Sequence, residues 1–199
     1  MTTLPPPPAL KPIAIGPVTV AEPVVLAPMT GVTDMPFRTL VRRYGSGLNV
    51  TEMVASEAAI RETRVSTQKT AWDRIEEPVS MQLVGCDPAS MAEAAKIQEG
   101  NGAAIIDINF GCPVKKVALG QSAGSALMRD EIAAGRILEA MVKAVRVPVT
   151  LKMRMGATHF LCKTLPKVAT EMALCVLGYN LTRVLNIVGV KALVAAIRA

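Results

Sequence analysis

Four polar residues interrupt or end hydrophobic stretches of the chain: Gln82, Asn109, Cys112 and Lys152. Cys112 lies in the constrained turn "GCP" directly after "AAIIDINF", a position for which a chemical role and an inert buried thiol are equally open interpretations. A thiol placed there acts as a nucleophile or as a proton donor. Since the single histidine, His159, lies far along the chain, no base is placed to activate a thiolate. Proton donation is therefore the better interpretation.

The other three side chains suit contact with a polar ligand. Lys152 ends the stretch "VPVTLK", where it either forms an ion pair at a rim or holds its charge against an anionic or electron-accepting ligand. Gln82 lies inside the apolar run "PVSMQLVG", and its amide requires a hydrogen-bond partner there. Asn109 either stabilises a turn or contacts the same ligand.

Short hydrophobic runs alternate with amphipathic stretches up to residue 154. The expected helices begin after Asp34 and Asp87, whose side chains are typical N-caps. Strands rich in Val, Ile and Leu that alternate with such helices indicate a parallel sheet covered by helices. The predicted strands cover residues 23–29, 48–53, 78–85, 103–113 and 147–154, and the predicted helices cover residues 34–45, 56–62, 87–102 and 129–146.

Two α/β folds match this alternation, an open doubly wound sheet and a β/α barrel. The first strand is not followed by the GxGxxG phosphate loop of a dinucleotide-binding fold, so the barrel is favoured. In a barrel the carboxyl ends of the strands converge on the active site. The polar residues expected to face one another there are Thr30, Asp34, Glu52, Gln82, Asn109, Cys112 and Lys152.

Composition limits the class of protein. The chain has 199 residues, 51% of them hydrophobic and 19% charged, which suffices for one buried core. Its four cysteines lack metal-ligand spacing, so we expect neither a zinc site nor a disulfide framework. The first 22 residues begin "MTTLPPPPALKP", unlike a signal peptide, and predict a polyproline-like tail. With no apolar segment long enough to span a bilayer, we expect a cytoplasmic protein without metal or membrane attachment.

Positive charge is concentrated near the C-terminus. Residues 1–155 hold 17 Lys and Arg against 15 Asp and Glu, whereas residues 156–199 hold 5 against 1. This surplus permits an anionic partner, although a solvated face is its commoner explanation. The Gly- and Ser-rich segment 115–128 predicts a mobile loop above the site, with Lys115 and Lys116 available to an RNA backbone.

Several ordered motifs resemble those of the bacterial tRNA-dihydrouridine synthases. They are "LAPMTGVTDMPFR", "TEMVAS", "VSMQLVGCDPASMAEAA", "AAIIDINFGCPVKKV", "AGSALM" and "VPVTLKMR", and together they cover roughly residues 13–154. The resemblance implies a TIM (β/α)8 barrel that holds FMN, followed by a helical domain that contacts tRNA. Such a protein is expected to act as a monomer.

The resemblance also implies roles for individual residues. The turn of Pro28, Met29 and Thr30 is similar to the one whose backbone meets the flavin, and Gln82 and Lys152 resemble the side chains that contact the flavin ring.

Two further residues would act on the substrate. Asn109 is similar to the residue that orients flavin and uracil, and Cys112 matches the general acid. The implied reaction uses NADPH to reduce FMN, passes a hydride from the flavin to C6 of an extruded uracil, and takes the C5 proton from the thiol.

The family pattern ends within "LKMRMGATHFLCKTLPKV", residues 151–168. A complete barrel takes about 250 residues, so we expect a partial TIM barrel of about five βα units in residues 23–154, preceded by the tail of residues 1–22. Residues 155–199 predict a helical tail that resembles the C-terminal end of DDE-type insertion-sequence transposases. These features predict an impaired or inactive synthase. The alternatives are a basic helical module that binds nucleic acid or a membrane surface, and a non-functional gene remnant.

Overall fold

The computed structural model describes residues 11–114, 117 and 123–153. They fall within the first of the chain's two units, Met1–Met153. The predicted helical tail of residues 155–199 lies outside the described residues, as do Lys115 and Lys116 of the predicted loop. Among the helices of the described part, none combines the length and the apolar character needed to cross a membrane.

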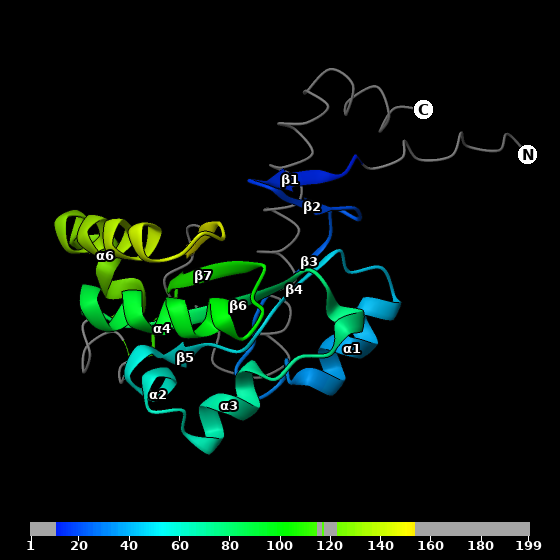
Figure 1. The fold of residues 1–199 in the computed structure, drawn as a ribbon, viewed down its shortest axis with the longest axis horizontal. Coiled ribbons are helices and arrows are strands. Elements are labelled where there is room, and N and C mark those ends of the chain that lie inside the picture. Colours follow the sequence, from blue (N-terminus) through cyan, green and yellow to red (C-terminus); the bar gives the residue numbers. More distant parts are fainter. Residues whose placement is uncertain (1–10, 115–116, 118–122, 154–199) are drawn as a thin grey trace, which may run out of the picture. The chain divides into compact units, whose positions relative to one another are not determined.

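A parallel sheet forms the centre of this unit (Figure 1). Its strand order is β3-β4-β6-β7-β8, with β5 also paired to β6, and every pairing is parallel. This arrangement confirms the predicted α/β class and is that of a partial TIM barrel. The strands are β3 (Val25–Leu26), β4 (Leu48–Val50), β5 (Val54–Ala55), β6 (Val79–Val84), β7 (Ile105–Phe110) and β8 (Val149–Met153).

The predicted helix starts are confirmed. Asp34 accepts a hydrogen bond from the backbone N–H of Phe37 at 3.0 Å, and Asp87 accepts one from that of Ser90 at 2.7 Å. One helix, α3, was not predicted, because its sequence "RVSTQKT" has no apolar periodicity. The helices are α1 (Met35–Arg43), α2 (Ser56–Ile60), α3 (Arg64–Thr70), α4 (Pro88–Gly100) and α6 (Glu131–Ala144), with 3-10 turns η1 (Arg74–Glu76) and η2 (Gly124–Arg129).

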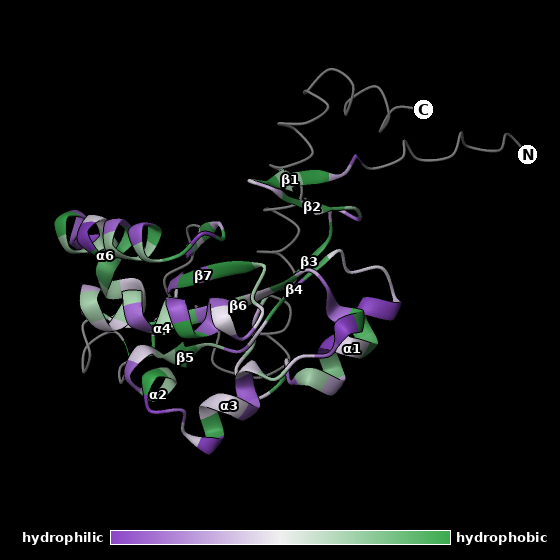
Figure 2. Ribbon diagram, viewed as in Figure 1, coloured by the Kyte–Doolittle hydropathy of each residue, from purple (hydrophilic) through white to green (hydrophobic). Residues whose placement is uncertain are grey.

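The two faces of the sheet differ in character because side chains alternate along a strand. One face of β6 and β7 forms the main core with helices α4 and α6, and Figure 2 shows most of β7 in the hydrophobic colour. Its largest fully buried members are Met81, Leu83, Met91, Ile106, Ile108, Ile137 and Met141. The alternate residues Gln82, Asp107 and Asn109 therefore lie on the opposite face, which would be the interior of a barrel.

Part of the predicted N-terminal tail is instead a β-hairpin. Strands β1 (Ile13–Ile15) and β2 (Val18–Val20) pair in antiparallel fashion across a turn in which Gly16 has a positive φ of 57°. Their apolar side chains pack against Leu48 and Ile105, the first residues of β4 and β7. The hairpin thus covers the amino ends of the strands and leaves their carboxyl ends for a site.

Candidate active site at the carboxyl ends of the strands

Three strands are linked by side chains at one level of the sheet. Gln82, Asp107 and Thr150 are register partners on β6, β7 and β8. Gln82 Nε2 donates to Asp107 Oδ2 at 2.5 Å, and Thr150 Oγ1 donates to Asp107 Oδ1 at 2.7 Å. The buried carboxylate therefore joins its two neighbouring strands.

Asn109 extends this network toward the carboxyl end of β7. Its Nδ2 donates to Gln82 Oε1 at 2.8 Å and to Met53 Sδ at 3.3 Å. Its Oδ1 accepts from the backbone N–H groups of Gly111 at 3.0 Å and Cys112 at 2.8 Å. A carboxylate that only accepts lies at one end of this chain of bonds, and N–H groups that only donate lie at the other. With an acceptor fixed at one end and donors at the other, the side-chain amides of Gln82 and Asn109 can each adopt only one orientation.

The turn that carries Cys112 is held from both sides. Its N–H is bound by Asn109, and its carbonyl accepts a hydrogen bond from the N–H of Ser125 at 3.0 Å. Gly124 approaches closely with a φ of 61°, and a Cβ atom added there would lie 2.8 Å from the Cys112 carbonyl oxygen. The thiol is free and half-buried. The sequence predicted a constrained turn, and the structure shows which groups constrain it.

Lys152 lies opposite Asn109 in the register of β7 and β8. Burial raises the pKa of the Asp107 carboxyl, while the hydrogen bonds from Gln82 and Thr150 and the charge of Lys152 lower it less strongly.

The structure therefore brings Gln82, Asn109, Cys112 and Lys152 to one region, as the sequence predicted. It adds Asp107, which sequence reasoning missed although it lies two residues before Asn109 in the same strand.

Asp107→Asn is expected to stabilise the protein at neutral pH. A carboxyl whose pKa is higher in the folded state than its usual 3.8 binds a proton more tightly when folded. The free energy of unfolding therefore falls as the pH rises from the pKa of the unfolded state through the raised pKa of the folded state. Below the pKa of the unfolded state the carboxyl is protonated in both states, and this loss is absent. The amide of Asn can accept from Gln82 and donate to Thr150. Urea unfolding at pH 7 should favour the variant, and the advantage should shrink as the pH falls toward 4; an equal effect at both values would contradict this.

The predicted turn of Pro28, Met29 and Thr30 lies directly after β3, at the other end of the sheet order. Pro28 is half-buried, while Met29 and Thr30 are exposed. Within the described ranges, no hydrogen bond joins this turn to Gln82, Asn109 or Lys152. The turn is instead bonded to Thr33, which precedes helix α1.

Two of the polar residues expected at the strand ends have structural partners. Asp34 caps helix α1. Glu52 is buried, and its Oε2 lies 3.6 Å from Lys69 Nζ on helix α3. Neither observation assigns these residues a chemical role.

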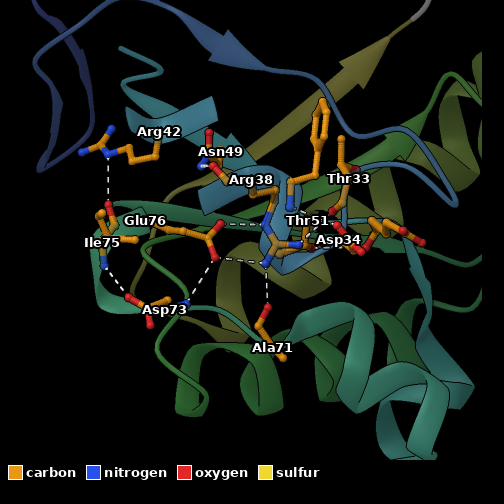
Figure 3. A network of polar contacts seen from close by, with 12 residues as sticks. Thr33, Asp34, Arg38, Arg42, Asn49, Thr51, Ala71, Asp73, Ile75 and Glu76 are labelled. Carbon is orange, nitrogen blue, oxygen red and sulfur yellow. Dashed lines mark hydrogen bonds and ion pairs between the residues drawn. The ribbon is translucent and has the colours of Figure 1, made fainter. Parts of the chain in front are cut away.

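Beside the turn is a fully buried ion pair that sequence reasoning also missed. Arg38 Nε donates to Glu76 Oε2 at 2.7 Å, and both side chains have no exposed surface (Figure 3). The guanidinium also donates to the carbonyl oxygens of Thr33 at 2.9 Å and Ala71 at 2.6 Å. One signal was present, since Arg38 is three residues from both Met35 and Val41 and so shares their side of helix α1.

Comparison with known proteins shows to which family the chain belongs. The family model described as dihydrouridine synthase matches residues 25–172. The chain belongs to the dihydrouridine synthase family. Its relatives include a probable tRNA-dihydrouridine synthase of Rickettsia conorii, 57% identical over 145 residues, and tRNA-dihydrouridine synthase B of Pseudomonas aeruginosa, 52% identical over 144. A synthase B from Xanthomonas campestris is 46% identical over 168 residues.

These matches cover most of the chain and about half of each relative. The Rickettsia and Pseudomonas alignments take in 72% of this chain, with 44% and 43% of the respective relative, and the Xanthomonas alignment takes in 83% and 50%. The family match also continues past Arg154, so the transition predicted within residues 151–168 lies inside the matched range. The transposase-like ending stays a prediction.

Proposed function

We propose that this chain carries a site for the FMN-dependent reduction of uridine to 5,6-dihydrouridine in tRNA, with NADPH as the reductant. The observation that carries the proposal is the hydrogen-bonded chain from Asp107 through Gln82 and Asn109 to Cys112. It places donor groups and a thiol together at the carboxyl ends of parallel strands in a member of the dihydrouridine synthase family.

The groups near the strand ends suit a flavin ring, whose polar edge is rich in hydrogen-bond acceptors. Gln82 uses one Nε2 proton on Asp107 and retains a second. Lys152 adds a positive charge on β8, and the Met29 turn adds backbone groups. We assign Pro28, Met29, Thr30, Gln82 and Lys152 to cofactor binding. FMN reduced by NADPH would supply the hydride that C6 of the uracil receives.

Cys112 then supplies the proton. Saturating the C5–C6 bond of uracil requires a hydride at one carbon and a proton at the other, and we assign the C5 proton to the Cys112 thiol. Asn109 accepts a hydrogen bond from the Cys112 N–H and therefore fixes the backbone position from which the thiol side chain extends. We also assign Asn109 to the orientation of uracil beside the cofactor.

The substrate and the extent of activity are part of the proposal. The relatives are described as tRNA-dihydrouridine synthases, and tRNA is accordingly the proposed partner. Because the chain spans about half the length of these relatives or less, we propose that the 199-residue chain alone binds FMN weakly and has reduced activity.

Flavin titration and tRNA analysis test this function. The purified chain should quench FMN fluorescence with a weak but saturable affinity, and dihydrouridine should be detected by mass spectrometry in tRNA from a synthase-deficient host that expresses it. Cys112→Ala should retain FMN binding and lower dihydrouridine formation by about 10²–10⁴-fold, the usual contribution of a general acid. The absence of any saturable FMN binding would overturn the proposal.

A further inference from the structure

The turn of residues 28–31 has little packing of its own. It follows β3, which is only two residues long and lies at the end of the sheet order. Met29 is 41% exposed, and Gly31 has a φ of 78°, which is strained for other residues. Loops with so few buried contacts are usually mobile unless their backbone groups are bonded.

Both backbone groups of Met29 are bonded by a single side chain. The Met29 N–H donates to Thr33 Oγ1 at 3.0 Å, and the same hydroxyl lies 3.2 Å from the Met29 carbonyl oxygen, to which it donates. That carbonyl also accepts from the N–H groups of Val32 and Thr33, each at 3.0 Å. The Thr33 side chain is completely buried. The Thr33 hydroxyl therefore closes the turn, because it ties both backbone groups of Met29 to the residue that precedes Asp34.

Thr33 is in turn fixed by Arg38. The guanidinium donates to the Thr33 carbonyl at 2.9 Å and is paired with Glu76 on η1 (Figure 3). Arg38 lies in the first turns of α1, and Asp34 caps that helix. A buried, charged and multiply bonded side chain thus anchors the residue that closes the turn.

Two backbone N–H groups of the turn are left available. Thr30 and Gly31 donate to no acceptor within the described part of the chain. Their neighbours are bonded inward, so these two groups keep one conformation while exposed. Donors whose positions are set in advance bind an acceptor without a further ordering cost.

We propose that Thr33 and Arg38 are positioning residues, which hold the 28–31 turn in the conformation that binds the flavin. Neither side chain contacts the cofactor in this proposal, which rests on the proposed function. Thr33 acts directly on Met29, and Arg38 acts through the Thr33 carbonyl.

The test compares Thr33→Val, which removes the hydroxyl with little change of shape, with Thr33→Ser, which keeps it. Thr39→Val is the matched control, since the Thr39 hydroxyl on α1 has no hydrogen-bond partner among the described residues. All are made in the 199-residue chain. Two readouts are needed: hydrogen exchange of the Met29 amide without flavin, measured by NMR, and FMN affinity, measured by fluorescence quenching.

Thr33→Val should speed exchange of the Met29 amide and weaken FMN binding by about 5- to 10-fold, the loss of roughly one hydrogen bond. Thr33→Ser should restore both, and Thr39→Val should change neither. Unchanged exchange in Thr33→Val would overturn the closing role of Thr33. Faster exchange with unchanged FMN affinity would overturn the positioning role and leave the proposed function standing. If the unaltered chain bound no FMN, the proposed function would fail, and the flavin role of Thr33 with it.

Discussion

Replacing Glu76 by Ala should lower the free energy of unfolding by about 3–5 kcal/mol, the usual cost of leaving a buried charge without its partner. Arg38 would keep its bonds to two carbonyl groups but lose both contacts to the carboxylate. The Asp73 N–H, which Glu76 also binds, would lose its partner. Urea unfolding followed by the fluorescence of the single tryptophan, Trp72, measures the change.

An exposed pair provides the control for this prediction. Glu57 lies 3.7 Å from Arg61 on the surface, where both side chains are about three-quarters exposed. Glu57→Ala should change stability little, because water screens such a pair. Glu76→Gln should fall between the two, since it keeps hydrogen-bonding capacity and loses the charge. A Glu76→Ala variant as stable as Glu57→Ala would show that burial of the pair does not matter.

Asn109→Ala should cost roughly 2–4 kcal/mol and release the turn that carries Cys112. The change removes the acceptor for two backbone N–H groups and the donor to Gln82 Oε1, and each buried group left unpaired costs about 1–3 kcal/mol before relaxation. We expect FMN binding to weaken as well, because Gln82 loses the bond that orients its amide. Thermal or urea unfolding and FMN titration check the two effects.

A second variant of Asn109 separates the role of its side chain as an acceptor from its role as a donor. Asn109→Asp keeps an acceptor for the Gly111 and Cys112 N–H groups, but it cannot donate to Gln82 and places a second carboxylate near Asp107. It should therefore be destabilised at neutral pH and recover as the pH falls. Asn101→Ala, at the exposed end of α4, is the matched control and should behave as the unaltered chain does. An Asn109→Asp variant of normal stability at pH 7 would refute this account of the network.

Elements with strong local signals were predictable. Helix α4 begins at the predicted cap, Asp87, and has a proline in its first turn, so its start follows from a few consecutive residues. Strand β7, with the sequence "IIDINF", is rich in β-branched and aromatic residues and lies ahead of the "GCP" turn. Once parallel strands were inferred, the meeting of Gln82, Asn109, Cys112 and Lys152 followed, because the carboxyl ends of such strands share one edge.

Other features depended on contacts between distant segments. The sequence of the β1–β2 hairpin predicts a tail, because the prolines before it suggest an extended chain. Its apolar side chains are shielded from water only when they pack against Leu48 and Ile105. Arg38 and Glu76 are 38 residues apart, and no local pattern pairs them. Asp107 looks like any polar strand residue until β6 and β8 bring Gln82 and Thr150 to its two oxygens.

The sequence by itself determined the alternation of the main strands and helices, the α/β class and the four polar residues of the candidate site, because caps, hydrophobic periodicity and turn residues act over a few positions. Only the tertiary structure decided how those residues are held. Hydrogen bonds and ion pairs such as Gln82–Asp107, Thr33–Met29 and Arg38–Glu76 depend on angle and distance, and these are set when the sheet and its helices pack together.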